Sequence, residues 1–261
     1  LEDANFAFTA GTDGWTVNEY EANDLTVTLA VDQGTLTLGA GIGDLAFSVG
    51  DGTADATMTF AATDTETNTA TDVTTWNYLA DFNGDVTLTI TINDGSGANV
   101  VDTLTLTVTA VNDPPVNTVG SAASTNEDVA VTISGNSVAD VDDTTLTAVT
   151  ISSTESGTMT IASPSSVSFS VGDGTADNTM TFQGTVANVN TAIATITWTS
   201  ASNDNTNAVI TLVTNDGDDT DSDTIAVTVA AINDPPTLSA TSSNPTHTEN
   251  QAAVSLYTNT A

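Results

Sequence analysis

Polar and apolar residues alternate along much of this chain, with the two-residue period of half-buried β-strands. The alternation is clearest over residues 25–38, where two strands flank a turn at Gly34, and it returns at residues 86–92 and 103–111 on either side of an Asn-Asp-Gly turn signal. Only residues 185–194 have a spacing that fits a helical turn. The pattern predicts an all-β protein whose sheets bury one face and expose the other.

The sequence repeats itself at a distance of about 121 residues. Phe-Ser-Val-Gly-Asp-Gly-Thr-Ala-Asp at 47–55 recurs at 169–177, and Ala-Val-Asn-Asp-Pro-Pro at 110–115 recurs as Ala-Ile-Asn-Asp-Pro-Pro at 231–236. Solenoid repeats are only about 20–50 residues long, so this period indicates whole domains in tandem.

The repeat divides the chain into two units and the beginning of a third. We expect the first unit at residues 1–112, the second at 113–234, and the first strand of a truncated third unit, a possible donor strand, at 235–261. Residues 208–214 and 224–232 reproduce the alternating strands of the first unit in the second. About six to eight short strands in roughly 110 residues predict a β-sandwich of immunoglobulin type for each unit.

The negative charge of the chain limits the kinds of partner that it can bind. The 261 residues include 34 Asp and Glu but no Lys, Arg or Cys, which gives a formal net charge of −34 and no disulfides. Such a chain cannot neutralise a phosphate backbone, so we expect no nucleic-acid binding, and it has no apolar run long enough for membrane insertion. Its carboxylates must be solvated, hydrogen-bonded, protonated or neutralised by an external cation. The abundance of oxygen ligands favours Ca2+ as the cofactor.

The Asn-Asp-Pro-Pro segments carry a family resemblance. Val-Asn-Asp-Pro-Pro at 111–115 is followed by Asn-Glu-Asp at 126–128 and by Asp-Val-Asp at 140–142. This order resembles the tandem cadherin-like and bacterial immunoglobulin-like repeats of giant calcium-dependent surface adhesins, over essentially the whole chain. The resemblance implies tandem immunoglobulin-like (cadherin-like) β-sandwich domains in an extracellular stalk or fibre.

The resemblance also implies where calcium binds. In that family a Glu near the start of one domain, the Asn-Asp of the linker and an Asp-x-Asp of the next domain share the ion. At the first junction the matching residues are Glu2, Asn112, Asp113, Asp140 and Asp142, and at the second they are Glu127, Asn233 and Asp234. Ala110 and Ala231 stand where the family linker usually carries a further Asp, which leaves the number of ions per junction open.

Other acidic or glycine-rich segments have a structural explanation beside a functional one. Residues 39–44 have the glycines of a secreted calcium nonapeptide but occur once, so we interpret them as a loop. Asp-Gly at 51–52 and 173–174 fits a hairpin turn better than a loop metal site. The stretch 215–223 has the acid density of a calcium loop without the glycine and closing Glu of an EF-hand, which favours a solvated hairpin tip.

Aromatic residues and the one histidine complete the candidates. Trp76 and Trp198 hold equivalent positions and are predicted to pack in the sandwiches, whereas Trp15 has no counterpart and is expected at the surface. His247 is expected to be an exposed residue at a strand start. Glu19 and Glu21 match the Asp pair of the second unit. They have the types of a glycosidase pair but no evident cleft, and we predict that the chain is not an enzyme.

These observations predict a non-enzymatic, extracellular stalk or fibre repeat of a large bacterial surface adhesin, rigidified by calcium at its linkers, in cell adhesion or biofilm assembly. Its expected partners are neighbouring repeats or copies of itself, surface polysaccharide or other cells. Two alternatives stay open. One is a polysaccharide-binding accessory module that uses an exposed Trp15. The other is a self-assembling filament subunit whose C-terminal strand adds to a neighbour's sheet edge.

Overall fold

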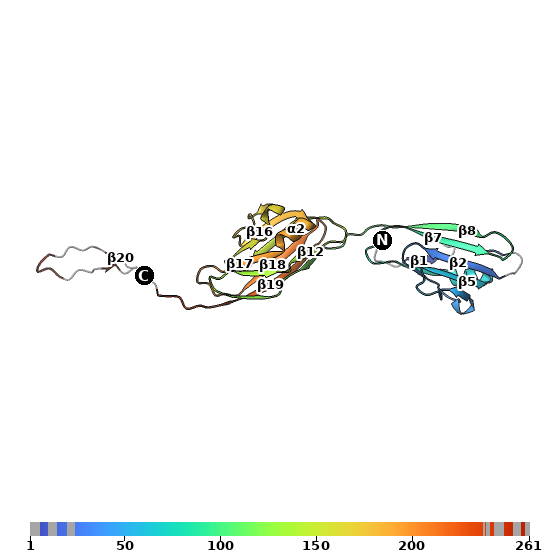
Figure 1. The fold of residues 1–261 in the computed structure, drawn as a ribbon, viewed down its shortest axis with the longest axis horizontal. Coiled ribbons are helices and arrows are strands. Elements are labelled where there is room, and N and C mark those ends of the chain that lie inside the picture. The colour runs from blue at the N-terminus through green and yellow to red at the C-terminus, as the bar shows by residue number, and fades with distance from the viewer. Residues whose placement is uncertain are drawn as a thin grey trace. The chain divides into compact units, whose positions relative to one another are not determined.

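The computed structural model describes residues 6–9, 15–19, 24–236, 238, 241–242, 248–252 and 257–258. Within these ranges the chain consists almost entirely of β-strands. Its contacts divide it into two compact units, Leu1–Asp113 and Pro114–Ala261, called the first and second unit below (Figure 1). In the C-terminal segment, β20 (Thr241–Ser242) pairs with β21 (Tyr257–Thr258).

The first unit is a two-layer sandwich. Its larger sheet has the order β4-β5-β2-β7-β8 and its smaller sheet the order β1-β6-β3, with antiparallel pairing throughout. Leu29, Phe60 and Trp76 lie in the core between them. The elements are β1 (Phe6–Thr9), β2 (Leu25–Val31), β3 (Thr35–Thr37), η1 (Ile42–Asp44), β4 (Ala46–Val49), β5 (Thr57–Ala62), α1 (Asp64–Thr71), β6 (Val73–Asn77), β7 (Gly84–Asn93) and β8 (Val100–Val108).

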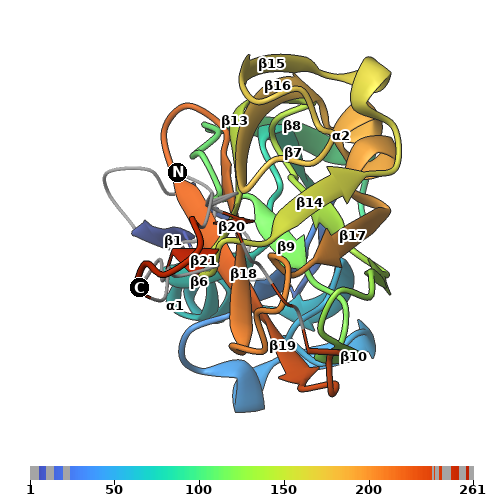
Figure 2. The same cartoon turned by 90° about the vertical axis from the view of Figure 1, so that its left-hand side faces the viewer.

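The second unit repeats this plan with additions at its start. Its sheets have the orders β10-β19-β18-β13-β16-β15, β11-β17-β14 and β12-β9. Figure 2 labels strands of the larger sheet of this unit, such as β13, β16 and β18, together with α2. The elements are β9 (Val116–Thr118), β10 (Ala123–Asn126), β11 (Val131–Ser134), β12 (Ser137–Ala139), β13 (Thr145–Ser153), β14 (Thr158–Ile161), η2 (Pro164–Ser166), β15 (Ser168–Val171), β16 (Thr179–Thr185), α2 (Val186–Ile193), β17 (Thr195–Thr199), β18 (Ala208–Asn215) and β19 (Thr220–Ala230).

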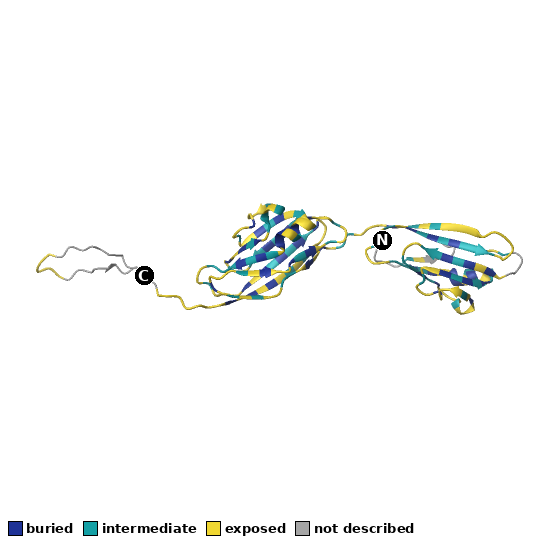
Figure 3. Ribbon diagram, in the orientation of Figure 1, coloured by how far each residue is buried: buried dark blue, intermediate teal, exposed yellow. Residues whose placement is uncertain are grey.

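The alternation in the sequence becomes alternating burial in the structure (Figure 3). Along β18, Ala208, Ile210, Leu212 and Thr214 are buried, and the residues between them are more exposed. Each unit encloses its own hydrophobic core, and the two cores share no residue. The predicted all-β class, with immunoglobulin-like sandwich domains, is confirmed.

Residues 25–38 differ from the expected pair of adjacent strands. They form β2 and β3, which belong to opposite sheets of the first unit. The chain crosses between the layers at Gly34, which has a φ of 74°. A Cβ atom at this position would lie 2.4 Å from the Asn77 carbonyl oxygen, so only glycine fits there. Leu36 can then enter the core from the smaller sheet, where it is fully buried.

Two helices lie at matching places in the units. The helix expected over residues 185–194 is present as α2, and the Thr185 hydroxyl caps the backbone N–H of Asn188 at 3.2 Å. Its counterpart α1 was not predicted, because seven of its eight residues are polar and half of them are threonines. The sequence signal was nevertheless there, since Thr63 and Glu66 form a reciprocal capping box.

The three tryptophans differ in how far they are buried. Trp76 and Trp198 are 1% and 0% exposed, which confirms their predicted packing role, and their indole N–H groups donate to the Gln33 carbonyl at 2.8 Å and the Ser153 hydroxyl at 3.1 Å. The expectation of a surface Trp15 is wrong, since Trp15 is half-buried and packs against the core of the first unit.

Candidate functional site

Two loops of the second unit bring aspartates together at one end of the strands of its larger sheet. One loop joins β12 to β13, and the other is the turn between β18 and β19. Because β13 and β18 are antiparallel neighbours, with Ala148 opposite Asn215, the start of β13 and the end of β18 lie at the same end of the sheet. The acidic cluster named here consists of Asp140, Asp142, Asp143, Asp216 and Asp218.

An aspartate shapes each of the two loops. Asp140 Oδ1 accepts the backbone N–H groups of Asp142 at 3.1 Å and Asp143 at 2.7 Å. Asp216 Oδ1 accepts those of Asp218 and Asp219, both at 2.7 Å, and the Asp216 residue is only 6% exposed. Turns of this kind are typical of Asp, whose short side chain reaches the backbone two or three residues ahead. They fix the backbone of each loop, from which its remaining carboxylates extend.

The cluster accumulates negative charge in a chain that has no Lys or Arg. The pKa of Asp143 is raised, first by its partial removal from water and then by the charges of Asp140, Asp216, Asp142 and Asp218. The second carboxylate oxygen of Asp140, Oδ2, is enclosed and has no hydrogen-bond partner among the described residues. An enclosed carboxylate oxygen among other carboxylates fits a hard cation, and carboxylates are the ligands that Ca2+ prefers.

A side chain of helix α2 positions the β12 end of the cluster. Asn190 Oδ1 accepts the N–H of Val138 at 2.7 Å, and Asn190 Nδ2 donates to the Val138 carbonyl at 2.9 Å. Val138 lies two residues before Asp140. A cavity of about 490 Å³ opens between this loop and the start of α2, lined by Asp140, Asp143 and Asn190 among others. The pair of hydrogen bonds therefore fixes the strand from which Asp140 extends.

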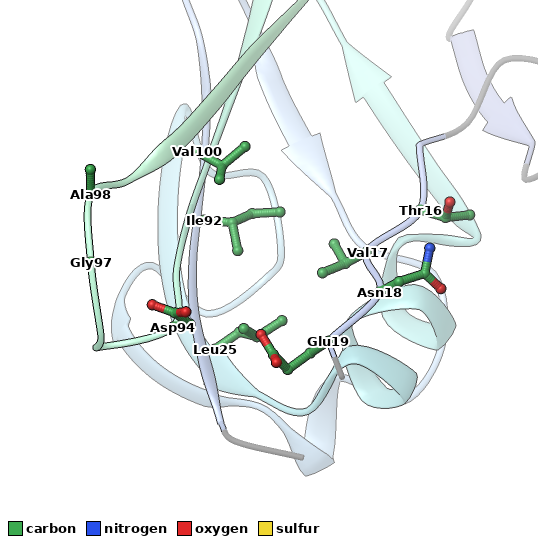
Figure 4. Close-up of a pocket in the computed structure, with 10 residues that line it drawn as sticks. All are labelled: Thr16, Val17, Asn18, Glu19, Leu25, Ile92, Asp94, Gly97, Ala98 and Val100. Carbon is green, nitrogen blue, oxygen red and sulfur yellow. The ribbon is translucent and has the colours of Figure 1, made fainter. Parts of the chain in front are cut away.

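The first unit repeats this arrangement with fewer acids. Asn68 of α1 accepts the N–H of Val17 at 2.8 Å and donates to its carbonyl at 2.7 Å. Two residues on, Glu19 lines a cavity of about 310 Å³ together with Asp94, and Figure 4 shows their carboxylates on either side of Leu25. The Ser96 hydroxyl and N–H lower the pKa of Asp94 by hydrogen bonding. Asp94 is thus held as a carboxylate at the position equivalent to Asp216.

The predicted ligands of the first junction are only partly described. Glu2 lies outside the described residues, as does Glu21. Asp140 and Asp142 lie in one turn, as their Asp-x-Asp spacing implied. Among the described residues, no set of three or more Asp, Glu or His side chains is placed to hold a metal ion. The ligand set at this junction therefore stays a prediction.

Glu127 lies beside the second linker. It is 6% exposed, its Oε1 accepts the N–H of Ile232 at 2.6 Å, and its own N–H donates to the Ala230 carbonyl at 3.0 Å. Ile232 directly precedes Asn233, so the structure brings Glu127 next to the linker residue with which the sequence grouped it. Asn233 and Asp234 themselves are exposed.

The two linkers share a local conformation. Asn233 Nδ2 donates to the Asp234 carbonyl at 3.3 Å, and Asn112 Nδ2 donates to the Asp113 carbonyl at 3.4 Å. Each linker therefore has the same hydrogen bond before two prolines, which fix φ and remove two N–H donors, but Asn112 and Asp113 are half-buried whereas Asn233 and Asp234 are exposed.

The repeated Asp-Gly loops have a structural role. Asp55 Oδ2 accepts the N–H groups of Asp51 at 2.9 Å and Gly52 at 2.8 Å, between the paired strands β4 and β5. In the second unit, Asp177 makes the equivalent bonds to Asp173 and Gly174. The hairpin interpretation of both segments is therefore confirmed, with the second Asp of each segment organising the loop.

Sequence reasoning missed part of the acidic cluster. The predicted solvated hairpin tip is present between β18 and β19, with residues 217–220 exposed, but Asp216 departs from it because it is buried beside the loop before β13. Asp143 and Asp218 were not singled out either. The available signal was the recurrence of Asn-Asp-Gly at 93–95 and 215–217, together with the match of Glu19 to Asp140. His247 lies outside the described residues.

Comparisons with known proteins give similarity to solved structures alone. The sequence matches no known protein family and no curated protein. The fold is similar to extracellular domains 3–5 of Drosophila OTK, with 8% identity, a TM-score of 0.31, and coverage of 87% of this chain and 61% of that one. It is also similar to Drosophila N-cadherin EC1-4, with 17% identity, a TM-score of 0.28, and coverage of 78% and 41%.

A further similar structure is an endo-fucoidan hydrolase of glycoside hydrolase family 107. The identity is 14% and the TM-score 0.22, and the alignment covers 79% of this chain but only 24% of the hydrolase. This chain thus spans about a quarter of the hydrolase and less than two thirds of the OTK fragment. Neither helix in the described part of the chain has the length and apolar run that crossing a bilayer requires.

Proposed function

We propose that this chain is a non-enzymatic, extracellular adhesion-type repeat that serves as part of a stalk or fibre of a large bacterial surface adhesin, and that Ca2+ binds at the acidic ends of its units. The observation that carries this proposal is the acidic cluster of the second unit, in a chain with no Lys or Arg. One of its carboxylate oxygens, Asp140 Oδ2, is enclosed without a hydrogen-bond partner among the described residues.

The donor set supports calcium over other metals. Ca2+ takes about six to eight oxygen ligands and accepts carboxylates, carbonyls and water in flexible geometry, whereas zinc and copper prefer nitrogen or sulfur ligands. Asp140 would ligate the ion through its enclosed Oδ2, and the other four aspartates of the acidic cluster would add to the negative field. The bound ion would supply the positive charge that the chain lacks and would join the two loops.

The linkers connect this site to a mechanical role. Asn112 and Asp113 directly precede the prolines that lead into β9, and β9 pairs with β12 so that Val116 lies opposite Ala139, next to Asp140. Ligation by the linker residues would therefore restrict the chain where one unit passes into the next. Glu127, Asn233 and Asp234 would act in the same way after the second unit.

The test is calorimetric unfolding with and without calcium. An extracellular module with a Kd of about 10⁻⁴–10⁻³ M gains about 1.4–2.7 kcal/mol at roughly 10 mM Ca2+. For a unit of about 120 residues this raises the Tm by about 6–11 °C. Equal ionic strength as NaCl should give a much smaller shift, because it only screens the carboxylates.

Two matched variants locate the effect. Asp140→Asn should remove most of the calcium-dependent shift of the second unit. Asp223→Asn should keep it, because Asp223 lies on the same β18–β19 hairpin but outside the acidic cluster. A wild-type Tm that calcium leaves unchanged, or equal responses of the two variants, would refute the calcium site.

A further inference from the structure

Each linker contains an Asp–Pro peptide bond, which is unusually labile in acid. The chain has six prolines, and only Pro114 and Pro235 follow an Asp. The first of these bonds divides the two units, and the second lies beyond Ala230, the last residue of β19. Neither bond lies within a strand or a hydrophobic core, so its hydrolysis would cut the chain without cutting a domain.

The lability of an Asp–Pro bond comes from both of its residues. An Oδ atom of the Asp side chain reaches the main-chain carbonyl carbon of the same residue in a five-membered ring, and such intramolecular attack has a high effective molarity. Proline contributes a tertiary amide, whose nitrogen leaves as a secondary amine. The bond therefore carries its own nucleophile and leaving group, and its rate depends on how the carbonyl group is activated.

The structure supplies this activation at Asp234. The side-chain Nδ2 of Asn233 donates to the Asp234 carbonyl oxygen at 3.3 Å. This oxygen becomes negatively charged when the carbonyl carbon is attacked, and a donor already in place stabilises the transition state as an oxyanion hole does. Hydrogen bonds of this kind are often long in the resting state and shorten as the charge develops.

The second linker is also anchored to the folded unit and open to water. Glu127 Oε1 accepts the N–H of Ile232 at 2.6 Å, which fixes the backbone immediately before Asn233. Asp234 and Pro235 are exposed, so solvent reaches both sides of the bond. The anchored backbone and the exposed bond together place the Asn233 donor on a carbonyl group that can react.

We propose that the chain cleaves itself between Asp234 and Pro235 in mild acid. An Oδ atom of the protonated Asp234 side chain bonds to the Asp234 carbonyl carbon, and its proton passes to the Pro235 nitrogen as the C–N bond breaks. The products are a cyclic anhydride at Asp234 and a new chain end at Pro235. One water molecule opens the anhydride to two carboxyl groups, so the sum of the steps is hydrolysis of one peptide bond.

This reaction goes beyond the calcium function proposed above and requires no metal. It uses one bond of the chain once and acts on no separate substrate. In a stalk of such units, an Asp–Pro bond in the linker would be a defined breaking point at which whole domains are released. That consequence rests on the proposed stalk, whereas the cleavage itself depends on residues 233–235.

The test follows cleavage of the whole chain in chelator at about pH 4, where an ordinary Asp side chain is about half protonated. Mass spectrometry quantifies the fragments 1–234 and 235–261. Asn233→Ala should lower the rate at this bond by at least about tenfold, because the donor to the reacting oxygen is lost. The same variant should leave cleavage between Asp113 and Pro114 unchanged. Asn112→Ala is the matched control at the first linker, where Asn112 Nδ2 donates to the Asp113 carbonyl at 3.4 Å, and it should leave cleavage after Asp234 unchanged.

Two further measurements separate a positioned donor from a mere effect of sequence. In concentrated urea the wild type and Asn233→Ala should cleave at the same rate, because unfolding removes the anchored geometry. Asp234→Glu keeps a carboxyl group but needs a six-membered ring, and it should lose most of the cleavage. Asn233 and Asp234 are exposed, so the variants should keep the wild-type unfolding transitions, which calorimetry at the same pH verifies.

Equal rates for the folded wild type and Asn233→Ala would overturn the proposal. So would a difference between them that persists in urea, undiminished cleavage of Asp234→Glu, or a wild type that yields neither fragment. Because chelator is present throughout, none of these outcomes depends on the calcium site.

Discussion

Replacing Asn190 tests how helix α2 supports the acidic cluster. Asn190→Ala removes both hydrogen bonds to the backbone of Val138, whose side chain is 3% exposed. Two hydrogen bonds contribute about 1 kcal/mol each, and the N–H and carbonyl left without partners raise the cost to about 2–4 kcal/mol. In a unit of about 120 residues this lowers the Tm by about 8–16 °C.

Differential scanning calorimetry of the whole chain can assign this loss to one unit. The cores share no residue, so we expect two transitions, of which only that of the second unit should move. The matched control is Asn188→Ala on the same helix, whose side chain is exposed and whose replacement should change stability by less than about 0.5 kcal/mol. The reasoning is refuted if Asn190→Ala shifts the transition no further than Asn188→Ala.

Two other perturbations give independent checks. The pKa of Asp143 is raised in the folded state, so in chelator the second unit should gain stability as pH falls from neutral through that pKa towards the ordinary Asp value. The Asp143→Asn variant should flatten this part of a Tm-versus-pH curve. An identical curve for the variant would contradict the assigned charge repulsion. Thr63→Ala removes the capping box of α1 and should destabilise the first unit by about 1 kcal/mol in denaturant unfolding, whereas an unchanged midpoint would show that the cap does not stabilise the helix.

The strands were predictable because a half-buried strand alternates apolar and polar residues with a period of two. The paired strands at 86–92 and 103–111 appear as β7 and β8 with ends shifted by a few residues. The crossing at Gly34 was not predictable, because alternation reports which face is buried and not which sheet a strand joins. Helix α1 was missed because polar threonines mask it, and its capping box was the local evidence.

The candidate site was predictable only as far as neighbours in sequence are neighbours in space. Asp140 and Asp142 were named from the Asp-x-Asp motif of the family resemblance, and the structure places both in one turn. Asp216 comes from a turn more than seventy residues away, and only the pairing of β13 with β18 brings that turn to the same end of the sheet. Comparing the two repeats at Asp94 and Asp216 would have indicated it, since an acid kept at one position of both units has a shared place in the fold.

The most direct test of the calcium site is an anomalous-difference map from crystals of the whole chain grown in millimolar CaCl2. We predict a calcium peak beside Asp140 Oδ2, with oxygen ligands at about 2.3–2.6 Å. Well-ordered loops around Asp140 and Asp216 with no anomalous peak between them would contradict it.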